Sequence, residues 1–586
     1  MYHLGIAYGH NATIAVVRDG ELVFCQSEER RNRIKNSTGF PDQTLAHVYD
    51  RICAPEEVAS CTLFLEKNLG YLMLREGGFR SAPLAGLLDA AQVRAWQADP
   101  VAADAAGAVL LDAADRIKAD PSINLEAAGW FVQKLGLPAD RIEHLDHHLS
   151  HVASAMPFLA WDAGTDTLLF TLDGEGDGIC AMVARLSGGR LTVLSTAPDY
   201  LSLGKIYHDV TGILGFKSNE HEYKVMGLAP YAKPEYCRDL VERFLAILRV
   251  NAAGEWEGSF RSHRGMLLKL VELCSFQRFD AIAGALQSYT ERVICDWIRH
   301  WVEQSGIRSI ACAGGVFMNV KANQRVLEMA CVERMVVVPS CGDESTAIGC
   351  AVHGSRRFQP QVPIRPVRQL YLGEAHDAQA IERQLIDDGI SKDFAISEPA
   401  DINVEVARLL AAGEVVARCT GRMEFGARAL GNRSILSHPG KAENIPMIND
   451  AIKNRDFWMP FAPTILAESV DRLVAGHAKM FSPFMMVSFD ATADGRRDLV
   501  AALHRADFTL RPQMLSREAN PDYYAIISRF RELTGIGALL NTSFNLHGEP
   551  IVASPTDAIR TMARSGLRYL ALDKFLLAKP AAAASS

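Results

Sequence analysis

Two stretches decide the fold of this chain: residues 1–29, MYHLGIAYGHNATIAVVRDGELVFCQSEE, and residues 166–198, DTLLFTLDGEGDGICAMVARLSGGRLTVLSTAP. Each opens with an apolar run that is typical of a buried strand, followed by a polar turn that contains glycine. Each then continues as a strand, a hairpin turn and a further strand, with Asp19-Gly20 at one hairpin turn and Gly188-Gly189 at the other. This shared plan predicts an internal structural duplication, and two unrelated three-stranded units are the alternative.

A duplicated three-stranded unit that opens with a polar turn suits the two lobes of an actin-like ATPase or sugar-kinase fold. In such a fold the two turns face each other across a nucleotide cleft. Residues 278–305 and the Ala-rich residues 84–118 are helical in character, and residues 309–313 and 334–338 resemble buried strands. The expected fold class is therefore α/β.

The composition excludes several classes of protein. The 586 residues are 48% apolar and 22% charged, which is typical of a globular protein of several domains. The net charge of −8 argues against a large nucleic-acid surface. Twelve cysteines without a CxxC pair argue against a zinc ribbon or a dense disulfide scaffold and favour a reduced, cytoplasmic protein. The N-terminus lacks the pattern of a signal peptide, and every apolar run is shorter than a membrane span of about 18 residues.

A break in the pattern divides the chain. Residues 354–368, GSRRFQPQVPIRPVR, contain three prolines and four arginines and show no periodicity. We therefore expect a first domain over residues 1–356, a linker over 357–368, a second domain over 369–580 and a tail over 581–586. Residues 70–125 contain no recognisable motif and are candidates for an acceptor pocket or an oligomer contact.

A histidine pair predicts a metal site. Asp146 is a candidate helix N-cap, and the apolar residues that follow suit a helix that ends before Pro157. On that helix His147 and His151 are four residues apart and share one face, as two ligands of a divalent metal would. Asp343, after the strand 334–338, is the candidate third ligand. A structural role for the histidines and a simple N-cap role for Asp343 remain open.

Two glycine-containing turns are candidate ligand contacts. Gly314-Gly315 follows a strand and precedes Asn319, and paired glycines let the backbone approach a ligand closely. The turn of residues 173–178, which begins at Asp173, is too acidic for bare phosphate and better suits a metal-bridged or hydroxyl-bearing ligand. A tight turn and a solvated loop are the corresponding alternatives. Lys224 follows the acidic and histidine-containing residues 219–223 and is a candidate for a substrate-facing loop.

The second domain contains a cluster of basic motifs: RMEFGARALGNRS (422–434), KNRDFWMPFAP (453–463) and NTSFN (541–545). Arginine forks, lysine and hydroxyl groups between glycines are what a phosphate requires. A solvated basic face usually has Glu at helical spacing and fits the flanking Gly and Pro residues poorly. The candidate anion-binding groups are the five basic residues Arg422, Arg428, Arg433, Lys453 and Arg455, together with the hydroxyl groups near them.

Together these motifs resemble the O-carbamoyltransferase family, which includes nodulation protein U and the cephalosporin and tobramycin carbamoyltransferases. Further matching stretches are GIAYGHNATIAVV, SEERRNRIKNSTGFP, DHHLSHVASA, TLDGEGDG, EYKVMGLAPYAKP, GGVFMN and GDESTAIG, in family order. The resemblance implies a Kae1-like domain of the actin-like (ASKHA) superfamily followed by a YrdC-like domain. It implies that ATP and carbamoyl phosphate, with Mg²⁺ expected beside ATP, form carbamoyl adenylate in the second domain. The first domain then transfers the carbamoyl group to an alcohol.

The resemblance also assigns roles to residues. It implies Fe²⁺ on His147, His151 and Asp343, and an activation site at Arg422, Arg428, Lys453, Arg455 and Ser543. Gly315 and Asn319 hold the adenylate in this reading, and Lys35 lies near it. His10 falls near the acceptor hydroxyl, where an ordinary imidazole pKa near 6.5 would suit a general base. The alternative for His10 is a residue that only shapes its loop.

Three other functions share parts of this pattern. Threonylcarbamoyl transfer to tRNA requires a nucleic-acid surface, for which a net charge of −8 offers little. The hydrogenase-maturation carbamoyltransferase has paired CxxC zinc sites, which this chain lacks. A non-catalytic nucleotide-binding protein of the actin-like fold would not need the basic second domain. The expected acceptor is a small-molecule alcohol of a sugar or natural product, as in secondary-metabolite biosynthesis, and the oligomeric state stays open.

Overall fold

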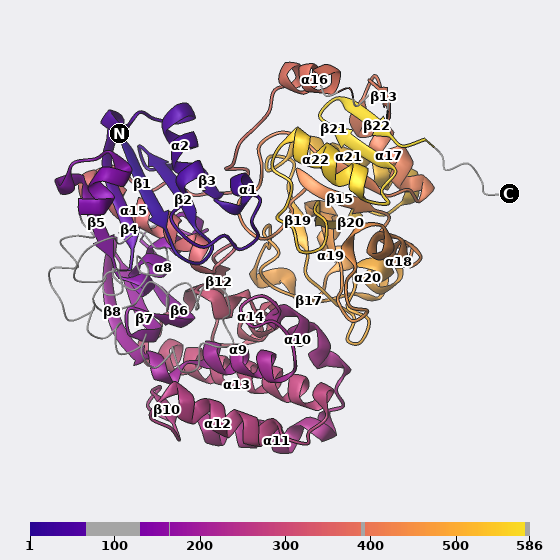
Figure 1. The fold of residues 1–586 in the computed structure, drawn as a ribbon. Coiled ribbons are helices and arrows are strands. Elements are labelled where there is room, and N and C mark those ends of the chain that lie inside the picture. Colours follow the sequence, from indigo (N-terminus) through magenta and orange to yellow (C-terminus); the bar gives the residue numbers. More distant parts are fainter. Residues whose placement is uncertain (66–128, 163, 388, 390–392, 581–586) are drawn as a thin grey trace, which may run out of the picture.

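The computed structural model describes the chain except residues 66–128, 163, 388, 390–392 and 581–586 (Figure 1). The helical expectation for residues 84–118, the segment 70–125 and the tail 581–586 therefore lie outside the described residues. Within the described part, no helix is both long and apolar enough to cross a membrane.

Two five-stranded sheets with the same topology form the first domain. In each sheet the first strand pairs antiparallel with the second and parallel with the fourth, and the strand order is 3-2-1-4-5. The first sheet consists of β1 (Tyr2–Ala7), β2 (Thr13–Arg18), β3 (Glu21–Ser27), β4 (Val58–Phe64) and β5 (Ile142–Leu145). The second consists of β6 (Thr167–Gly176), β7 (Ile179–Ser187), β8 (Arg190–Pro198), β11 (Ser309–Ala313) and β12 (Arg334–Val337). The predicted duplication is confirmed, and the fold is of the duplicated actin-like type.

Two helices lie between these sheets (Figure 1). Helix α15 (Thr346–Phe358) packs on β1 and β4, and α8 (His147–Ala155) packs on β6 and β11 and against α15. The helices touch closely, because a Cβ on Gly349 would lie 1.8 Å from the carbonyl oxygen of Ser150. This packing brings the first residues of α8 to the ends of the strands of the second sheet.

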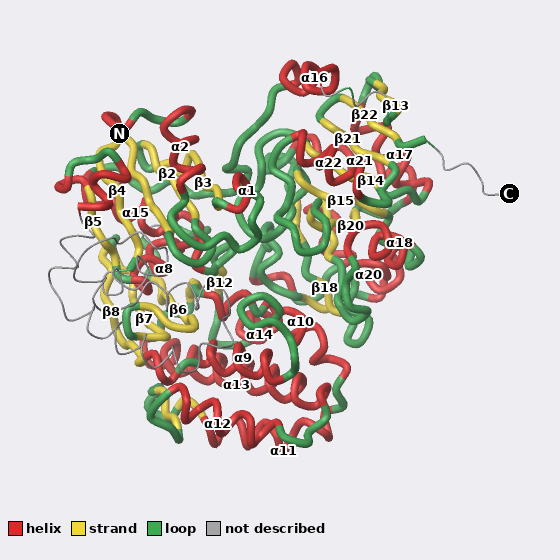
Figure 2. Tube along the Cα trace, in the orientation of Figure 1, coloured by secondary structure: helices red, strands yellow, loops and turns green. Residues whose placement is uncertain are grey.

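A layer of helices covers the second lobe (Figure 2). They are α9 (Leu203–Ile213), α10 (Glu222–Leu228), α11 (Pro234–Ile247), α12 (His263–Cys274), α13 (Phe279–Ser305) and α14 (Val320–Glu328). Helix α13 confirms the helix expected over residues 278–305. The hairpin β9 (Leu248–Val250) and β10 (Trp256–Gly258) joins α11 to α12. Helices α1 (Glu29–Asn32) and α2 (Asp42–Arg51) follow the first hairpin of the chain.

The predicted polar turn of residues 173–178 is shorter than expected. Strand β6 continues to Gly176, and only Asp177 and Gly178 adopt positive φ angles, of 50° and 88°. The strand register shifts between Leu172 and Gly176. Gly176 is required there, because a Cβ would lie 2.2 Å from the Cγ atom of His147. The glycines therefore allow the end of β6 to reach the histidine pair.

The segment predicted as a linker is attached to the first domain. Helix α15 extends to Phe358, and the segment that follows donates from Arg365 N to Gly20 O at 2.8 Å and from Val367 N to Pro157 O at 2.7 Å. The N–H of Cys25 donates to Leu372 O, farther along the same segment. The prolines keep this segment extended. Residues 359–373 therefore run along the first domain and are here called the strap.

An eight-stranded mixed sheet forms the centre of the second domain, in the order β13-β22-β21-β14-β15-β20-β16-β19. Its strands are β13 (Ala395–Ser397), β14 (Val416–Cys419), β15 (Arg433–Ser437), β16 (Ala462–Leu466), β19 (Gln513–Leu515), β20 (Ala538–Ser543), β21 (Tyr569–Leu572) and β22 (Phe575–Ala578). The surrounding helices include α16 (Ala378–Asp387), α17 (Ile402–Ala412), α18 (Asn444–Ile448), α19 (Val470–Leu473), α20 (Ala493–Asp498), α21 (Pro521–Thr534) and α22 (Pro555–Arg564). A short ribbon, β17 (Phe489–Asp490) and β18 (Thr509–Leu510), lies beside this sheet.

Candidate functional site

Helix α8 presents the histidine pair at its N-terminus. The carboxylate of Asp146 accepts a hydrogen bond from the N–H of Leu149 at 3.0 Å, which confirms the predicted N-cap. His147 and His151 are both buried, and their rings lie side by side with centroids 4.8 Å apart. The close packing of α8 against β6 turns both imidazoles toward the end of that strand.

Two carboxylates complete a cluster around these histidines. The Oδ1 atom of Asp343 lies 3.8 Å from His147 Nε2 and 3.9 Å from His151 Nε2. Asp173, at the end of β6, places its Oδ2 atom 3.1 Å from His151 Nε2 and 3.9 Å from His147 Nε2. One ligand atom from each of the four residues lies within 4.8 Å of the others. The sequence placed Asp173 among the cofactor-binding residues and did not predict it as a candidate metal ligand beside His147 and His151.

The donor set fits a divalent metal ion. Both Nε2 atoms are buried, and neither makes a hydrogen bond with any residue that the structure describes. Two imidazole nitrogens and two carboxylate oxygens suit zinc, iron or manganese. Burial lowers the pKa of His151 and raises the pKa of Asp343 to about 7. Burial also opposes a charge on His147, but Asp173 and Asp343 raise its pKa to about 9. A bound cation would satisfy the two buried imidazoles and the two half-buried carboxylates together.

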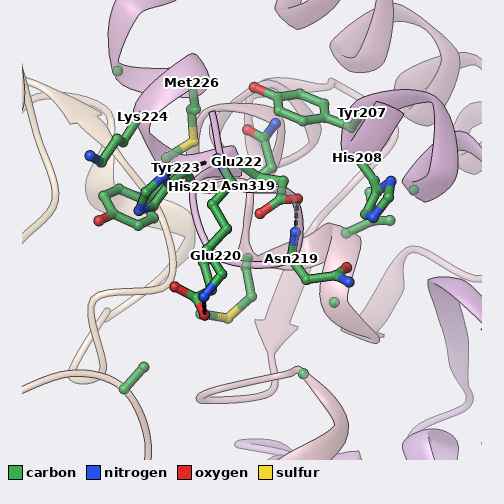
Figure 3. A pocket seen from close by; sticks show the side chains of 18 of the residues that line it. Tyr207, His208, Asn219, Glu220, His221, Glu222, Tyr223, Lys224, Met226 and Asn319 are labelled. Atoms are coloured by element: carbon green, nitrogen blue, oxygen red, sulfur yellow. Dashed lines mark hydrogen bonds and ion pairs between the residues drawn. The ribbon is translucent and has the colours of Figure 1, made fainter. Parts of the chain in front are cut away.

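The His/Asp cluster of these four residues opens into a cavity of about 1880 Å³ that both domains line. The acidic end contains Asp173 and Asp343, and the turn with Gly315 and Asn319 forms part of the wall. Figure 3 shows the part of the wall that includes Asn319, the loop before α10 and the first residues of α10. The predicted site residues on the wall are His10, Lys35, Asp173, Lys224, Gly315, Asn319, Asp343, Arg428, Lys453, Arg455 and Ser543.

Four cations gather where the second domain lines this cavity: Arg428, Lys453, Arg455 and Arg511, here called the basic cluster. None of the four forms an ion pair with a carboxylate in the described part of the chain. Burial lowers the pKa of Lys453 well below its ordinary value, and Arg455 and Lys35 lower it further. Burial likewise lowers the pKa of Arg455 to about 10. Buried cations without counterions are the mark of an anion site.

Hydroxyl and amide groups hold the basic cluster in place. The Nζ atom of Lys453 donates to Ser543 Oγ at 3.0 Å and to Asn545 Oδ1 at 2.7 Å. Arg455 donates to Thr542 Oγ1 at 2.9 Å. The Nε atoms of Arg428 and Arg511 are buried, and within the described ranges of the chain they have no hydrogen-bond partner. These donors are therefore left for a ligand.

Comparison with known proteins agrees with this arrangement. A family model described as Carbamoyltransferase N-terminus matches residues 133–352, and one described as Carbamoyltransferase C-terminus matches residues 407–579. Nodulation protein NolNO of Sinorhizobium fredii is 31% identical over 583 residues, which cover 97% of this chain and 79% of that protein. The chain belongs to the carbamoyltransferase family. It is accordingly an enzyme that transfers carbamoyl groups.

Two further relatives of this carbamoyltransferase are also nodulation proteins. Nodulation protein NolO of Bradyrhizobium diazoefficiens is 32% identical over 448 residues, 74% of this chain and 79% of that protein. Nodulation protein U of Sinorhizobium fredii is 24% identical over 619 residues, 99% of each chain. The similarity therefore extends over both domains.

The structure of the carbamoyltransferase does not bring Arg422 into the cavity. Its guanidinium donates to the carbonyl oxygens of Val23, Leu372 and Gly373, at 2.8, 2.8 and 3.1 Å. Arg422 thus ties the second domain to β3 and to the strap, and its expected place in the basic cluster is corrected. Arg511 lies in the basic cluster instead. In the sequence, its only signal is that it is an arginine next to a short strand.

The glycine turn and Asn319 have mainly backbone and capping contacts. Gly314 adopts a φ of 95°, and the N–H of Gly315 donates to Asp173 Oδ2 at 2.8 Å. The side chain of Asn319 accepts from the N–H of Ala322 at 3.0 Å and exchanges hydrogen bonds with Gln287. Gly314 itself lies behind the cavity wall, against the carbonyl of Leu172.

Proposed function

We propose that this carbamoyltransferase makes carbamoyl adenylate from carbamoyl phosphate and ATP and transfers the carbamoyl group to the hydroxyl of a small-molecule alcohol. One observation carries the proposal: a single cavity contains an unpaired basic cluster from one domain and a buried His/Asp cluster from the other. The first suits phosphates, and the second suits a metal ion. A non-catalytic nucleotide-binding protein would not need both.

In the proposed activation step, the basic cluster holds the phosphates of the two co-substrates, with Mg²⁺ accompanying ATP. Forming carbamoyl adenylate consumes one water and releases one phosphate and one pyrophosphate. Arg428, Arg455 and Arg511 would stabilise the negative charge, and Lys453 would contribute a further donor. Carbamoyl phosphate and carbamoyl adenylate are both readily hydrolysed. A cavity that the activation and transfer sites share would limit this loss to water.

In the proposed transfer step, His10 takes the proton from the acceptor hydroxyl, whose oxygen attacks the carbamoyl carbon while AMP leaves. His10 and Lys35 both line the cavity on the side of the first domain. His147, His151, Asp173 and Asp343 would hold the metal, for which we propose Fe²⁺. When bound, a divalent metal would act as a Lewis acid on the carbonyl of the mixed anhydride.

The experiment measures the two half-reactions separately. The purified protein with ATP and carbamoyl phosphate should release pyrophosphate without an acceptor. Arg455→Ala should abolish this release but retain transfer from supplied carbamoyl adenylate, and His147→Ala should do the reverse. Arg529→Gln, a surface change beside Glu532, is the control. ATP binding without pyrophosphate release by the wild type, or loss of the same step in both variants, would contradict the proposal.

A panel of alcohols would identify the acceptor. Sugars and polyketide alcohols are the proposed class, and carbamoylated products would be detected by mass spectrometry. All twelve cysteines are free, as expected for the cytoplasmic location we propose.

A further inference from the structure

Helix α10 of the first domain is held by the same loop that carries part of the basic cluster. The Nζ atom of Lys224 lies 3.0 Å from Asp456 Oδ2, and Trp458 Nε1 donates to the carbonyl of Lys224 at 3.1 Å. His504 lies within hydrogen-bond distance of Gly227 O at 2.8 Å. Lys453 and Arg455 immediately precede Asp456. A ligand in the basic cluster and the position of α10 are therefore linked through one short loop.

Lys224 and Asp456 meet inside the cavity. Both residues line it, and the lysine side chain is only 13% exposed. Figure 3 shows Lys224 and Tyr223 extending from the first turn of α10 along the pocket wall. Tyr223 also acts on the basic cluster, since its phenol opposes the lowering of the pKa of Arg455. The first turn of α10 thus borders the basic cluster.

We infer that Lys224 receives the phosphate of carbamoyl adenylate from the basic cluster, and that Asp456 is the partner that occupies Lys224 until then. This inference rests on the proposed function. The intermediate is an anion that must leave four cations to reach the His/Asp cluster. Lys224 is a cation on the cavity wall that connects the two clusters. Its carboxylate partner, Asp456, belongs to the second domain, where the anion forms. Exchange of Asp456 for phosphate keeps Lys224 paired throughout, so the lysine charge is never left alone in a partly buried site.

The single substitutions Lys224→Gln and Asp456→Asn distinguish this role of Lys224 from a purely structural role in holding the two domains together. Breaking the pair on either side would loosen the interface equally. The inference predicts opposite effects: Lys224→Gln removes the phosphate partner, whereas Asp456→Asn removes its competitor. Lys224→Arg preserves the charge and should behave like the wild type.

The experiment uses the full chain with ATP labelled at the α-phosphate, carbamoyl phosphate and no acceptor. Rapid filtration separates carbamoyl adenylate retained on the protein from that in the filtrate, and pyrophosphate reports its formation. Lys224→Gln should retain about tenfold less carbamoyl adenylate per pyrophosphate released, in keeping with loss of one charged hydrogen bond. Asp456→Asn should retain as much as the wild type or more. Lys574→Gln, which breaks the exposed Lys574–Glu398 pair outside the cavity, is the matched control.

Equal losses in Lys224→Gln and Asp456→Asn would overturn the inference and assign the pair to domain docking. Unchanged retention in Lys224→Gln would overturn it as well. Failure of the proposed function gives a different result, because the wild type would then release no pyrophosphate.

Discussion

The carboxylate of Asp173 accepts a hydrogen bond from the N–H of Gly315 at 2.8 Å, across 142 residues of sequence. The same Oδ2 atom lies 3.1 Å from His151 Nε2. Asp173 therefore joins the His/Asp cluster to the glycine turn on the cavity wall. A substitution of Asp173 or of Gly315 would therefore alter both the His/Asp cluster and the glycine turn.

Substitution of Asp173 by Ala should remove the bound metal. It deletes one of four ligands and leaves two buried imidazoles with a single carboxylate, so metal content should fall at least about tenfold. The measurement is the metal-to-protein ratio by mass spectrometry. Val152→Ala on the same helix is the control, since Val152 is buried in the hydrophobic core and offers no ligand atom. Equal metal loss in both variants would mean that α8, and not the cluster, was disturbed.

Substitution of Arg511 by Gln should weaken anion binding. Arg511 is half-buried beside Arg428 and Arg455, and its buried Nε atom has no hydrogen-bond partner among the described residues, so a bound phosphate would pair with it. We expect the Kd for pyrophosphate, measured by calorimetry, to rise about tenfold. The exposed Arg529→Gln variant should bind like the wild type. An unchanged Kd in Arg511→Gln would place the anion elsewhere in the cavity.

Pyrophosphate binding should take up protons through Lys453. Burial lowers the pKa of this lysine in the free protein, and a bound anion would raise it again. Affinity should therefore fall as the pH rises through the free-state pKa. Calorimetry in two buffers of different ionisation enthalpy measures the uptake, which Lys453→Met should reduce.

The side chain of Lys453 affects the free energy of unfolding with the opposite dependence on pH. Without ligand, the unfolded chain binds more protons at Lys453 than the folded chain, because the folded pKa is the lower of the two. The stability contribution of Lys453 should then rise with pH between the folded and unfolded pKa values. Proton release on pyrophosphate binding would contradict the first of these two expectations. A free energy of unfolding that depends on pH in the same way in the wild type and in Lys453→Met would contradict the second.

Gly426→Ala should destabilise the contact between the two domains. Gly426 has a φ of 94°, and a Cβ there would lie 2.6 Å from the Cβ of Ser340, whose hydroxyl accepts from the N–H of Ala427. Gly535→Ala is the matched control, with a φ of 80° and open space around it, and should cost about 1–2 kcal/mol. Gly426→Ala should lower the Tm further in calorimetry. Equal Tm values for the two variants would show that Ser340 moves aside freely.

Much of the fold could be predicted from the sequence. The duplicated strands, the Asp19-Gly20 hairpin, the N-cap at Asp146 and the helix over 278–305 depend on patterns within a few residues. The histidine pair followed from helical spacing alone. The bounds of the turn after Asp173 were wrong because the glycines there allow β6 to continue past it.

The candidate site could be predicted only in part. Asp343 was expected beside the histidines and lies there, whereas Arg422 contacts backbone carbonyls outside the cavity and Arg511 replaces it. Both arginines lie next to short strands, Arg422 after β14 and Arg511 between β18 and β19. Which guanidinium enters the cavity depends on how the second domain packs on β3 and the strap.

The sequence by itself determined the element types, the duplication, the helical histidine pair and the basic character of the second domain, because hydrophobic period, capping and charge are local properties. Only the tertiary structure decided that Asp173 joins the metal cluster, that Lys224 meets Asp456 and that one cavity contains both clusters. These contacts join residues far apart in the chain. They exist because two sheets, α8 and the second domain pack in one arrangement, which no local pattern encodes.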